Sequence, residues 1–340
     1  MALSLGEKVS EFVPFLPNFV DTHPRKTEFG KQLADRQTLF VGKRRVEIVV
    51  VNPTHQFPKF PVVVLPGFME SLDANEPILH ALHDANHPIY SFNPQSISLK
   101  EHAIIGSALI EKASDAATDG RVGLLLHSMS GMYGSEAALR HADKIRSIVN
   151  IATAGIVGEQ NPFGLTRRFL NGGAAETGRS LIRRPSQGKV LLDGMAYAAG
   201  QIIRNPWQTL GLAHGLAVQE VDLLDIQAFL KAQHKIPLGL IAFTNDSTFK
   251  MNDVQSAISK KNKELREIVP KAVGDPTVLF DGVLSIPGNH YATASHTELS
   301  HVVQIVPLIF NLLETKAQEN YSPIISQGVV YLRDRLGLAA

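Results

Sequence analysis

The sequence predicts an α/β protein with a doubly wound, mostly parallel sheet and an inserted helical cap. Short apolar runs alternate with longer segments of helical periodicity, which is typical of this class. The alternation pauses between Gly155 and about Gln233, where the pattern is helical and contains no good strand. We therefore expect an N-terminal arm at 1–37, a core at 38–155 and 234–340, and a cap at 156–233.

The expected strands begin with a hairpin at 38–51, two β-rich runs around Gly42. The run 60–65 is continuously apolar, as in a strand that is buried on both faces. Further strands are expected at 87–93, 121–126, 146–152, 237–243 and 278–286.

The clearest helix is expected at 98–117, because Ser98 is followed three residues later by Glu101 in a capping-box pattern. The helical pattern of the cap is broken by Gly172-Gly173, Pro185 and Pro206. Other helices of the core are expected at 71–86, 130–142, 253–268, 298–315 and 321–340.

Composition indicates one large core with an inserted subdomain: 340 residues, 44% hydrophobic and 19% charged. The net charge is +1, so no overall field favours a nucleic acid partner. The chain has no cysteine, which excludes disulfides, thiolate metal sites and cysteine nucleophiles, and fits a reducing compartment. With no apolar run long enough to span a bilayer and no signal-peptide pattern, we expect a cytoplasmic protein.

Ser128 is the most informative residue, because it follows the apolar run 122–126 and is followed at once by small residues. This pattern predicts a hydroxyl on a tight turn between a strand and a helix N-terminus. Serine is a weak nucleophile at neutral pH, so catalysis requires a base and an orienting acid.

Two further reactive side chains come directly after expected strands. Asp246 follows the strand at 237–243, and His290 follows the last strand. In an open parallel sheet the ligand binds beyond the carboxyl ends of the strands. We therefore predict a triad with Ser128 as nucleophile, His290 as base and Asp246 as acid.

Other residues could fill these roles. Asp246 is favoured because it alone directly ends a strong strand, and His290 because it lies in a Pro-Gly-Asn-His turn. The alternatives for the acid are Asp222, Asp225, Asp253 and Asp281, and those for the base are His296 and His301.

These residues resemble the α/β-hydrolase superfamily, and the resemblance covers roughly Thr38 to Leu313 in element order. The family's elbow is Gly-x-Ser-x-Gly, and here Leu126 and Ser130 stand at its two glycine positions. Leu126 therefore needs room for a full side chain beside the turn.

A second segment, Leu65-Pro66-Gly67-Phe68, is similar to the family's His-Gly segment, with Pro66 in place of histidine. The resemblance implies that the backbone N–H groups of Phe68 and Met129 form the oxyanion hole, which Pro66 leaves intact.

The resemblance implies a serine hydrolase, esterase-like or lipase-like, that cleaves a small-molecule or lipid-like carboxylic ester without a cofactor or metal. A thioesterase or amidase is an alternative. So is a non-catalytic binding or regulatory protein on the same scaffold, to which Leu126 and Pro66 point.

Other clusters have simpler interpretations. His127 is expected to pack or hydrogen-bond locally, and the aromatic-rich segment 11–20 to form an arm on the body. His80, His83 and His87, with Asp84 nearby, could bind a metal but are commonly a solvated face. The basic residues of the cap predict either a solvated face or a lid that attracts acidic substrates or lipid surfaces: Arg167, Arg168, Arg183, Arg184 and Lys189.

Overall fold

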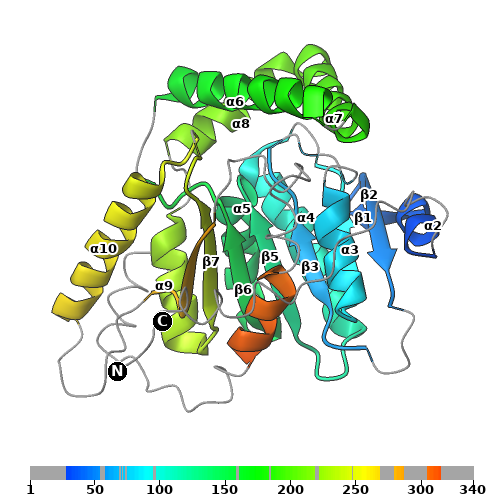
Figure 1. Cartoon of the computed structure of the whole chain (residues 1–340). Helices are drawn as coiled ribbons and strands as arrows, with labels where there is room; N and C mark the ends of the chain where they lie inside the picture. Colours follow the sequence, from blue (N-terminus) through cyan, green and yellow to red (C-terminus); the bar gives the residue numbers. More distant parts are fainter. Residues whose placement is uncertain are drawn as a thin grey trace.

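The part of the chain that the structure describes contains one eight-stranded sheet with the order β1-β2-β4-β3-β5-β6-β7-β8 (Figure 1). β1 pairs with β2 and β2 with β4 in antiparallel fashion, and all remaining neighbours are parallel. This confirms the predicted mostly parallel sheet and the initial hairpin, which turns at Gly42 with φ 61°. The computed structural model describes residues 28–53, 58–68, 70, 72, 75–94, 97–157, 161–183, 185–218, 222–246, 248–268, 279–286 and 305–314. The strands are β1 Arg36–Val41, β2 Arg44–Val51, β3 Val62–Leu65, β4 Ile89–Phe92, β5 Val122–His127, β6 Ile145–Ile151, β7 Leu238–Phe243 and β8 Gly282–Ile286.

Helices cover both faces of the sheet, so its central strands are buried on both sides. Every residue of β3, β5 and β7 is buried, as the continuous apolar runs predicted. Alternate residues of a strand enter different cores. Leu124 packs towards the helices at 99–115, 130–140 and 223–234, and Leu125 towards the helices at 76–84 and 305–314. The helices outside the insertion described next are α2 Glu28–Ala34, α3 Glu76–Asp84, α4 Leu99–Asp115, α5 Ser130–Arg140, the 3₁₀ turn η4 Ala142–Lys144 and α10 Met251–Ile268.

α4 begins where the capping pattern predicts. The Ser98 hydroxyl accepts a hydrogen bond from the Glu101 N–H at 3.2 Å, and the Ser98 N–H donates to the Glu101 carboxylate at 3.0 Å. This reciprocal pair satisfies two N–H groups of the first turn, which have no partner within the helix.

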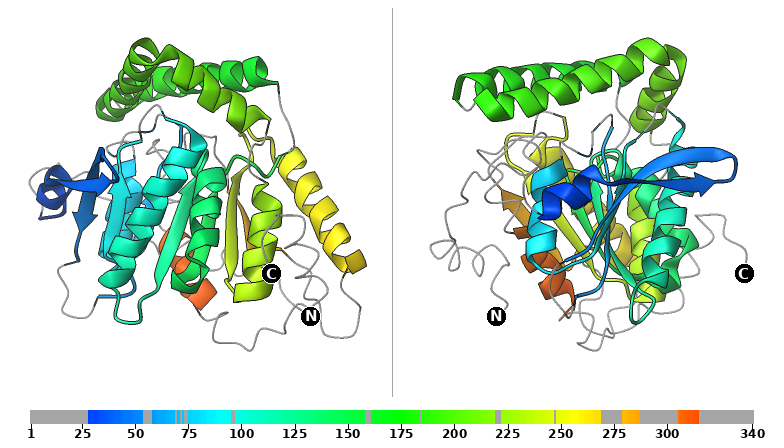
Figure 2. Two further views of the ribbon diagram at one scale, coloured as in Figure 1. Left: turned by 180° about the vertical axis from the view of Figure 1, so that it is seen from behind. Right: turned by 90° about the vertical axis from the view of Figure 1, so that its right-hand side faces the viewer.

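Four helices form the insertion between β6 and β7: α6 Pro162–Arg183, α7 Pro185–Arg204, α8 Pro206–Ala217 and α9 Leu223–His234. α6, α7 and α8 lie over the carboxyl edge of the sheet (Figures 1 and 2), and we call these three helices the cap. α9, which the sequence pattern groups with the cap, lies instead against α5. There the Gln227 amide donates to the Ser135 hydroxyl at 3.0 Å and to the Asn150 side chain at 2.8 Å.

Several predicted segments fall outside the described residues: most of the N-terminal arm, the helix at 321–340, and His290, His296 and His301. Within the described ranges, no helix combines the length and the apolarity that a membrane crossing requires.

Candidate active site

Ser128 occupies the sharp turn between β5 and α5. Its φ is +52°, a conformation that side chains other than glycine rarely adopt and that costs free energy. The turn is fixed by the backbone: the Ser128 N–H donates to Ile151 at 3.1 Å, and its carbonyl accepts from Gly131 at 3.1 Å and Ala154 at 2.8 Å. A serine on a tight turn at a strand end is the geometry that the elbow pattern predicted, although Ser128 itself is buried, with 5% of its surface exposed.

Leu126 finds its room beside Gly134, one turn into α5. A Cβ added at Gly134 would lie 2.5 Å from Leu126 Cδ2 and 2.9 Å from Leu65 Cδ1. In the family, a glycine at position 126 leaves space between the strand and the helix. Here Leu126 carries a side chain, and the absence of one at Gly134 leaves the space that it needs. Leu126 is compatible with a normal elbow.

Ser130 replaces the second glycine of the elbow and uses its hydroxyl to join two strand ends. The hydroxyl is fully buried, accepts from the His127 N–H at 2.6 Å and donates to the Leu65 carbonyl at 2.7 Å. Leu65 ends β3, so this single side chain holds the ends of β3 and β5 together.

The loop after β3 lies against Ser128. A Cβ added at Gly67 would lie 3.0 Å from the Ser128 Cβ, so only glycine allows this approach. The Tyr133 hydroxyl donates to the Pro66 carbonyl at 2.8 Å and fixes the start of the loop. Within the described part of the chain, the backbone N–H groups of Phe68 and Met129 donate no hydrogen bond, as oxyanion donors require.

A buried acid–imidazole pair supports this loop. The Glu70 carboxylate accepts from the Gly67 N–H at 2.7 Å, and the same oxygen lies 2.8 Å from His127 Nδ1. Burial alone would raise the pKa of Glu70. The charge of His127 and hydrogen bonds from His127, Gly67 and Asn75 outweigh it and lower that pKa below its ordinary value.

His127 does form a hydrogen bond, but with Glu70 rather than with a local partner, and sequence reasoning missed this residue. Glu70 lies 57 residues before His127 in the sequence. The one available signal was its position, three residues after Gly67 in the predicted oxyanion loop.

Asp246 lies just beyond the end of β7, at the same edge of the sheet as Ser128. Its side chain is 5% exposed, and one carboxylate oxygen accepts from the N–H groups of Thr248 at 2.7 Å and Phe249 at 2.9 Å. These bonds fix the carboxylate in a tight turn. A small apolar pocket beside it is lined by Ala152, Thr153, Ile156, Leu240, Ala242, Phe243, Phe249 and Val254.

Three of the four competing acids have structural roles. Asp281 pairs with Lys231 at 2.9 Å and accepts from the Leu238 N–H at 2.8 Å, which places it at the amino edge of the sheet. Asp225 forms a buried ion pair with Lys261, and burial is the main cause that raises its pKa. Asp222 accepts from the N–H of residue 225 and caps α9, and Asp253 lies in the first turn of α10.

No group of three or more histidine, aspartate or glutamate residues in the described ranges is arranged to hold a metal ion. His80 and His83 pack their rings against Phe29, with centroids 4.7 and 5.3 Å apart. His87 is buried, and its Nδ1 lies 2.9 Å from the Phe60 carbonyl. Burial lowers the pKa of His87 to about 4.

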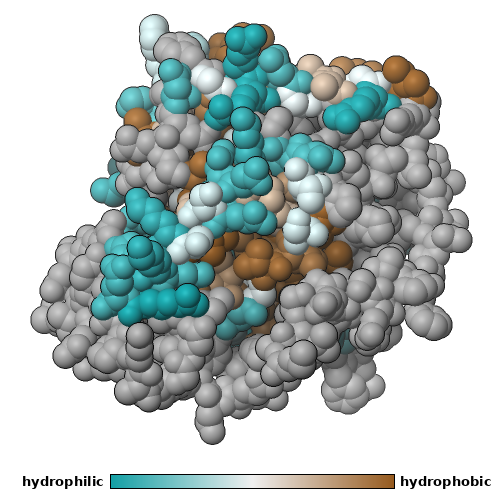
Figure 3. Space-filling model, turned by 60° about the vertical axis from the view of Figure 1, so that its left-hand side comes forward, coloured by the Kyte–Doolittle hydropathy of each residue, from teal (hydrophilic) through white to brown (hydrophobic). Residues whose placement is uncertain are grey.

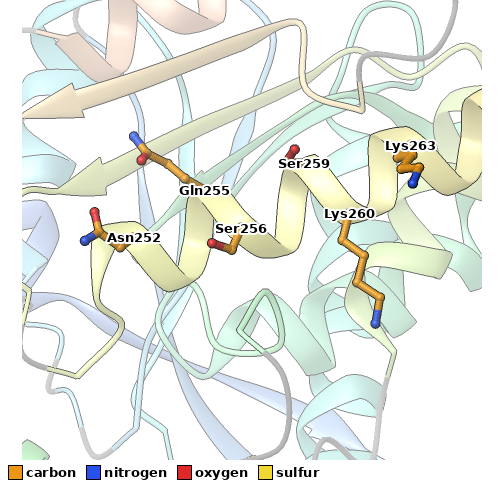
Figure 4. A pocket seen from close by; sticks show the side chains of 6 residues that line it. All are labelled: Asn252, Gln255, Ser256, Ser259, Lys260 and Lys263. Atoms are coloured by element: carbon orange, nitrogen blue, oxygen red, sulfur yellow. The ribbon is translucent and has the colours of Figure 1, made fainter.

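The surface offers two hollows of different character. Figure 3 shows apolar side chains gathered in a hollow beneath the cap, on the side of the molecule that it draws. A pocket of about 630 Å³ lies along α10, and its six lining residues all come from that one helix (Figure 4). These six are polar and include neither Ser128 nor Asp246, so we assign no substrate to this pocket: Asn252, Gln255, Ser256, Ser259, Lys260 and Lys263.

Comparison with known proteins identifies the fold. The sequence matches no family model and no curated protein. Among solved structures, the chain is similar to an esterase from Thermogutta terrifontis, with a TM-score of 0.58 at 12% identity over 82% of this chain and 99% of that one. It is also similar to a bromoperoxidase from Bacillus anthracis, with a TM-score of 0.54 at 14% identity over 81% and 99% of the two chains. An enol-lactonase from Burkholderia xenovorans LB400 gives a TM-score of 0.54 at 15% identity over 81% and 100%.

The strand order, the strained serine elbow and these similarities define the class: the chain has the α/β-hydrolase fold. The similar structures differ in activity, so this likeness identifies the fold and leaves the reaction to be argued from the site.

Proposed function

We propose that the protein is a serine hydrolase that cleaves a carboxylic ester through an acyl-enzyme intermediate. Ser128 is the nucleophile, His290 the base and Asp246 the acid. The backbone N–H groups of Phe68 and Met129 form the oxyanion hole. The substrate is a small-molecule or lipid-like ester that enters between the cap and the carboxyl edge of the sheet.

The observation that carries this proposal is the strained turn at Ser128, with φ +52°, packed against the glycine loop at Gly67. A non-glycine residue stays in this conformation only where the surrounding structure requires it, and such strain concentrates at functional sites. A serine that only capped α5 would need neither the strain nor the close approach of a second loop.

The chemistry follows from these positions. His290 removes the proton of Ser128 as its oxygen attacks the acyl carbon, and Asp246 orients the imidazole and stabilises its cation. The negative charge that develops on the carbonyl oxygen is stabilised by the N–H groups of Phe68 and Met129. Loss of one such donor lowers kcat by about 10²–10³-fold in related chemistry. Water, activated by the same histidine, then releases the acyl group.

A fluorophosphonate probe, which reacts covalently with activated serines, tests the nucleophile. We expect labelling of the wild type, no labelling of Ser128→Ala, and full labelling of the control Ser259→Ala, whose serine is exposed on α10. A folded wild-type protein that is not labelled would overturn the proposal and favour a binding protein on this scaffold.

The base and the substrate class require a second experiment. Turnover of a chromogenic carboxylic ester should be abolished in His290→Ala and retained in His296→Ala, and the reverse result would move the base to His296. Matched ester, thioester and amide substrates, in a series of chain lengths, identify the bond that is cleaved fastest. A preference for the thioester or amide would contradict the ester assignment while leaving the nucleophile in place.

A further inference from the structure

The cap exposes an unusual share of the large apolar side chains of this protein. Of the thirteen such side chains that are exposed in the described ranges, eight belong to α6, α7 and α8. The three most exposed are Ile182 on α6 at 86%, Ile203 on α7 at 80% and Trp207 on α8 at 83%. Exposed apolar groups concentrated in this way mark an interaction surface.

These side chains do not face the body of the protein. The contacts of the cap with the body come from other positions: Phe169 packs against Phe68 with ring centroids 5.6 Å apart, and the Tyr197 hydroxyl donates to the Pro94 carbonyl at 2.7 Å. On α8, the buried Leu212 lies roughly 140° around the helix from Trp207. The apolar side chains are therefore separate from the contacts with the body. We call the solvent-exposed surface of α6, α7 and α8 that carries them the outer face of the cap: Leu170, Leu181, Ile182, Leu192, Ile202, Ile203, Trp207 and Leu210.

The net charge of the cap indicates which kind of partner its outer face binds. Residues 161–218 contain seven arginine or lysine residues and two acidic residues, a net charge of +5. The whole chain has a net charge of +1, so the remainder carries −4. Arg167, Arg179 and Arg204 are exposed, and Arg204 directly follows Ile203.

A symmetric pair of caps would bring two surfaces of the same positive charge together, which disfavours a second copy of the chain as the occupant. An anionic lipid surface fits both the positive charge of the cap and its exposed apolar side chains. It attracts arginine and lysine electrostatically, and it accepts apolar side chains and tryptophan at the boundary between headgroups and acyl chains. α6 and α7 lie side by side above the sheet (Figure 2), and polar and apolar side chains are interspersed on the cap (Figure 3).

We propose that the outer face of the cap binds the protein to the surface of anionic lipid bilayers, with Ile182, Ile203 and Trp207 entering the interface. This binding is peripheral and independent of the reaction proposed for Ser128. It brings the cap next to lipid and turns the carboxyl edge of the sheet, which the cap covers, towards the bilayer.

Trp207 makes the proposal directly testable, because it is the only tryptophan of the chain. With vesicles of phosphatidylcholine mixed with phosphatidylglycerol, we expect its emission to shift to shorter wavelength and to be quenched by brominated acyl chains. Vesicles of phosphatidylcholine alone should bind much more weakly, and high salt should release the protein from the anionic vesicles. Ser128→Ala should bind like the wild type, so that a failure of the proposed reaction and a failure of this proposal are distinguishable.

Variants locate the surface. Co-sedimentation with the anionic vesicles should weaken about tenfold in Ile203→Gln and about fivefold in Arg204→Gln. Phe40→Gln is the matched control, because Phe40 is 70% exposed on β1, outside the cap, and its loss should leave binding unchanged.

Four results would overturn the proposal. The first is an absence of binding to anionic vesicles, and the second is equal binding to both kinds of vesicle. The third is emission typical of a buried tryptophan in the lipid-free monomer, which would show that the outer face is already covered. The fourth is a lipid-independent shift that grows with protein concentration together with a dimer in analytical ultracentrifugation, which would assign the face to self-association.

Discussion

Replacement of Glu70 tests whether the buried pair with His127 positions the oxyanion loop. In Glu70→Leu, the Gly67 N–H and the His127 ring lose the oxygen that they share, at 2.7 and 2.8 Å. Each buried group without a partner costs about 1–3 kcal/mol, so we expect a loss of about 2–6 kcal/mol in the free energy of unfolding. Glu70→Gln keeps an oxygen at this place and should lose only about 1–2 kcal/mol, the difference between charged and neutral hydrogen bonds.

The effect on turnover separates positioning from mere stability. The Phe68 N–H directly follows Gly67, so freeing Gly67 displaces this proposed oxyanion donor. A complete loss of one donor lowers kcat by about 10²–10³-fold, and for a displaced donor we expect kcat to fall about 10–100-fold in Glu70→Leu, with KM almost unchanged. Glu70→Gln should recover most of this loss.

Steady-state kinetics with a chromogenic ester, at a temperature where circular dichroism shows each variant folded, measures this split. Glu111→Leu is the control, because its side chain is 57% exposed on α4. A folded Glu70→Leu with the kcat of the wild type would refute the positioning role.

The lowered pKa of Glu70 adds a pH test. As pH falls below the ordinary pKa of a glutamate, Glu70 takes up a proton in the unfolded state but not yet in the folded state. The stability that Glu70 contributes is therefore lost as pH falls from this ordinary value through the folded pKa, and Glu70→Gln should remove this part of the acid sensitivity.

Three further predictions concern stability in urea denaturation. Ser130→Ala, and equally the family-like Ser130→Gly, should lower the free energy of unfolding by about 1–3 kcal/mol because a buried hydrogen bond is lost; an unchanged midpoint would contradict the role of this hydroxyl. Gly134→Ala should cost about 1–3 kcal/mol by overpacking against Leu126, and much less in a Leu126→Ala background; additive effects in this double-mutant cycle would disprove the compensation. His87, whose pKa is lowered to about 4 by burial, should make the protein less stable as pH falls from about 6.5 to about 4, by up to roughly 3 kcal/mol, because only the unfolded state takes up the proton in this window. His87→Asn should flatten this dependence, and an unchanged slope would exclude His87 as its cause.

The parts of the fold that sequence reasoning predicted are those encoded locally. The capping box of Ser98 and Glu101 lies within four residues, and the elbow at Ser128 is marked by an apolar run that ends in small residues. Short apolar runs predict the central strands correctly because helices cover both faces of this sheet. These signals need no knowledge of distant contacts.

The parts that it missed depend on contacts between distant segments. Leu126 conflicts with the family pattern until the strand and helix pack, and only then does Gly134 appear as its compensation. Glu70 and His127 meet because β3 and β5 are neighbours in the sheet, which their separation in the sequence does not reveal. Helical periodicity likewise cannot distinguish a helix over the sheet edge from α9 on its face. That distinction comes from Gln227, which bonds with Asn150 and Ser135 in the interior.

The edge-to-face contact between Phe68 and Phe169 has a consequence for how variants of the cap should be interpreted. The backbone N–H of Phe68 is a proposed oxyanion donor, and its ring packs against Phe169 of α6. The environment of the reacting groups therefore includes a residue about a hundred positions further along the chain. Substitutions at Phe169 will change the turnover number even for esters too small to reach α6. A library of cap variants that is screened only for substrate preference would record such changes in turnover as altered specificity, although no substituted side chain contacts the bound acyl group.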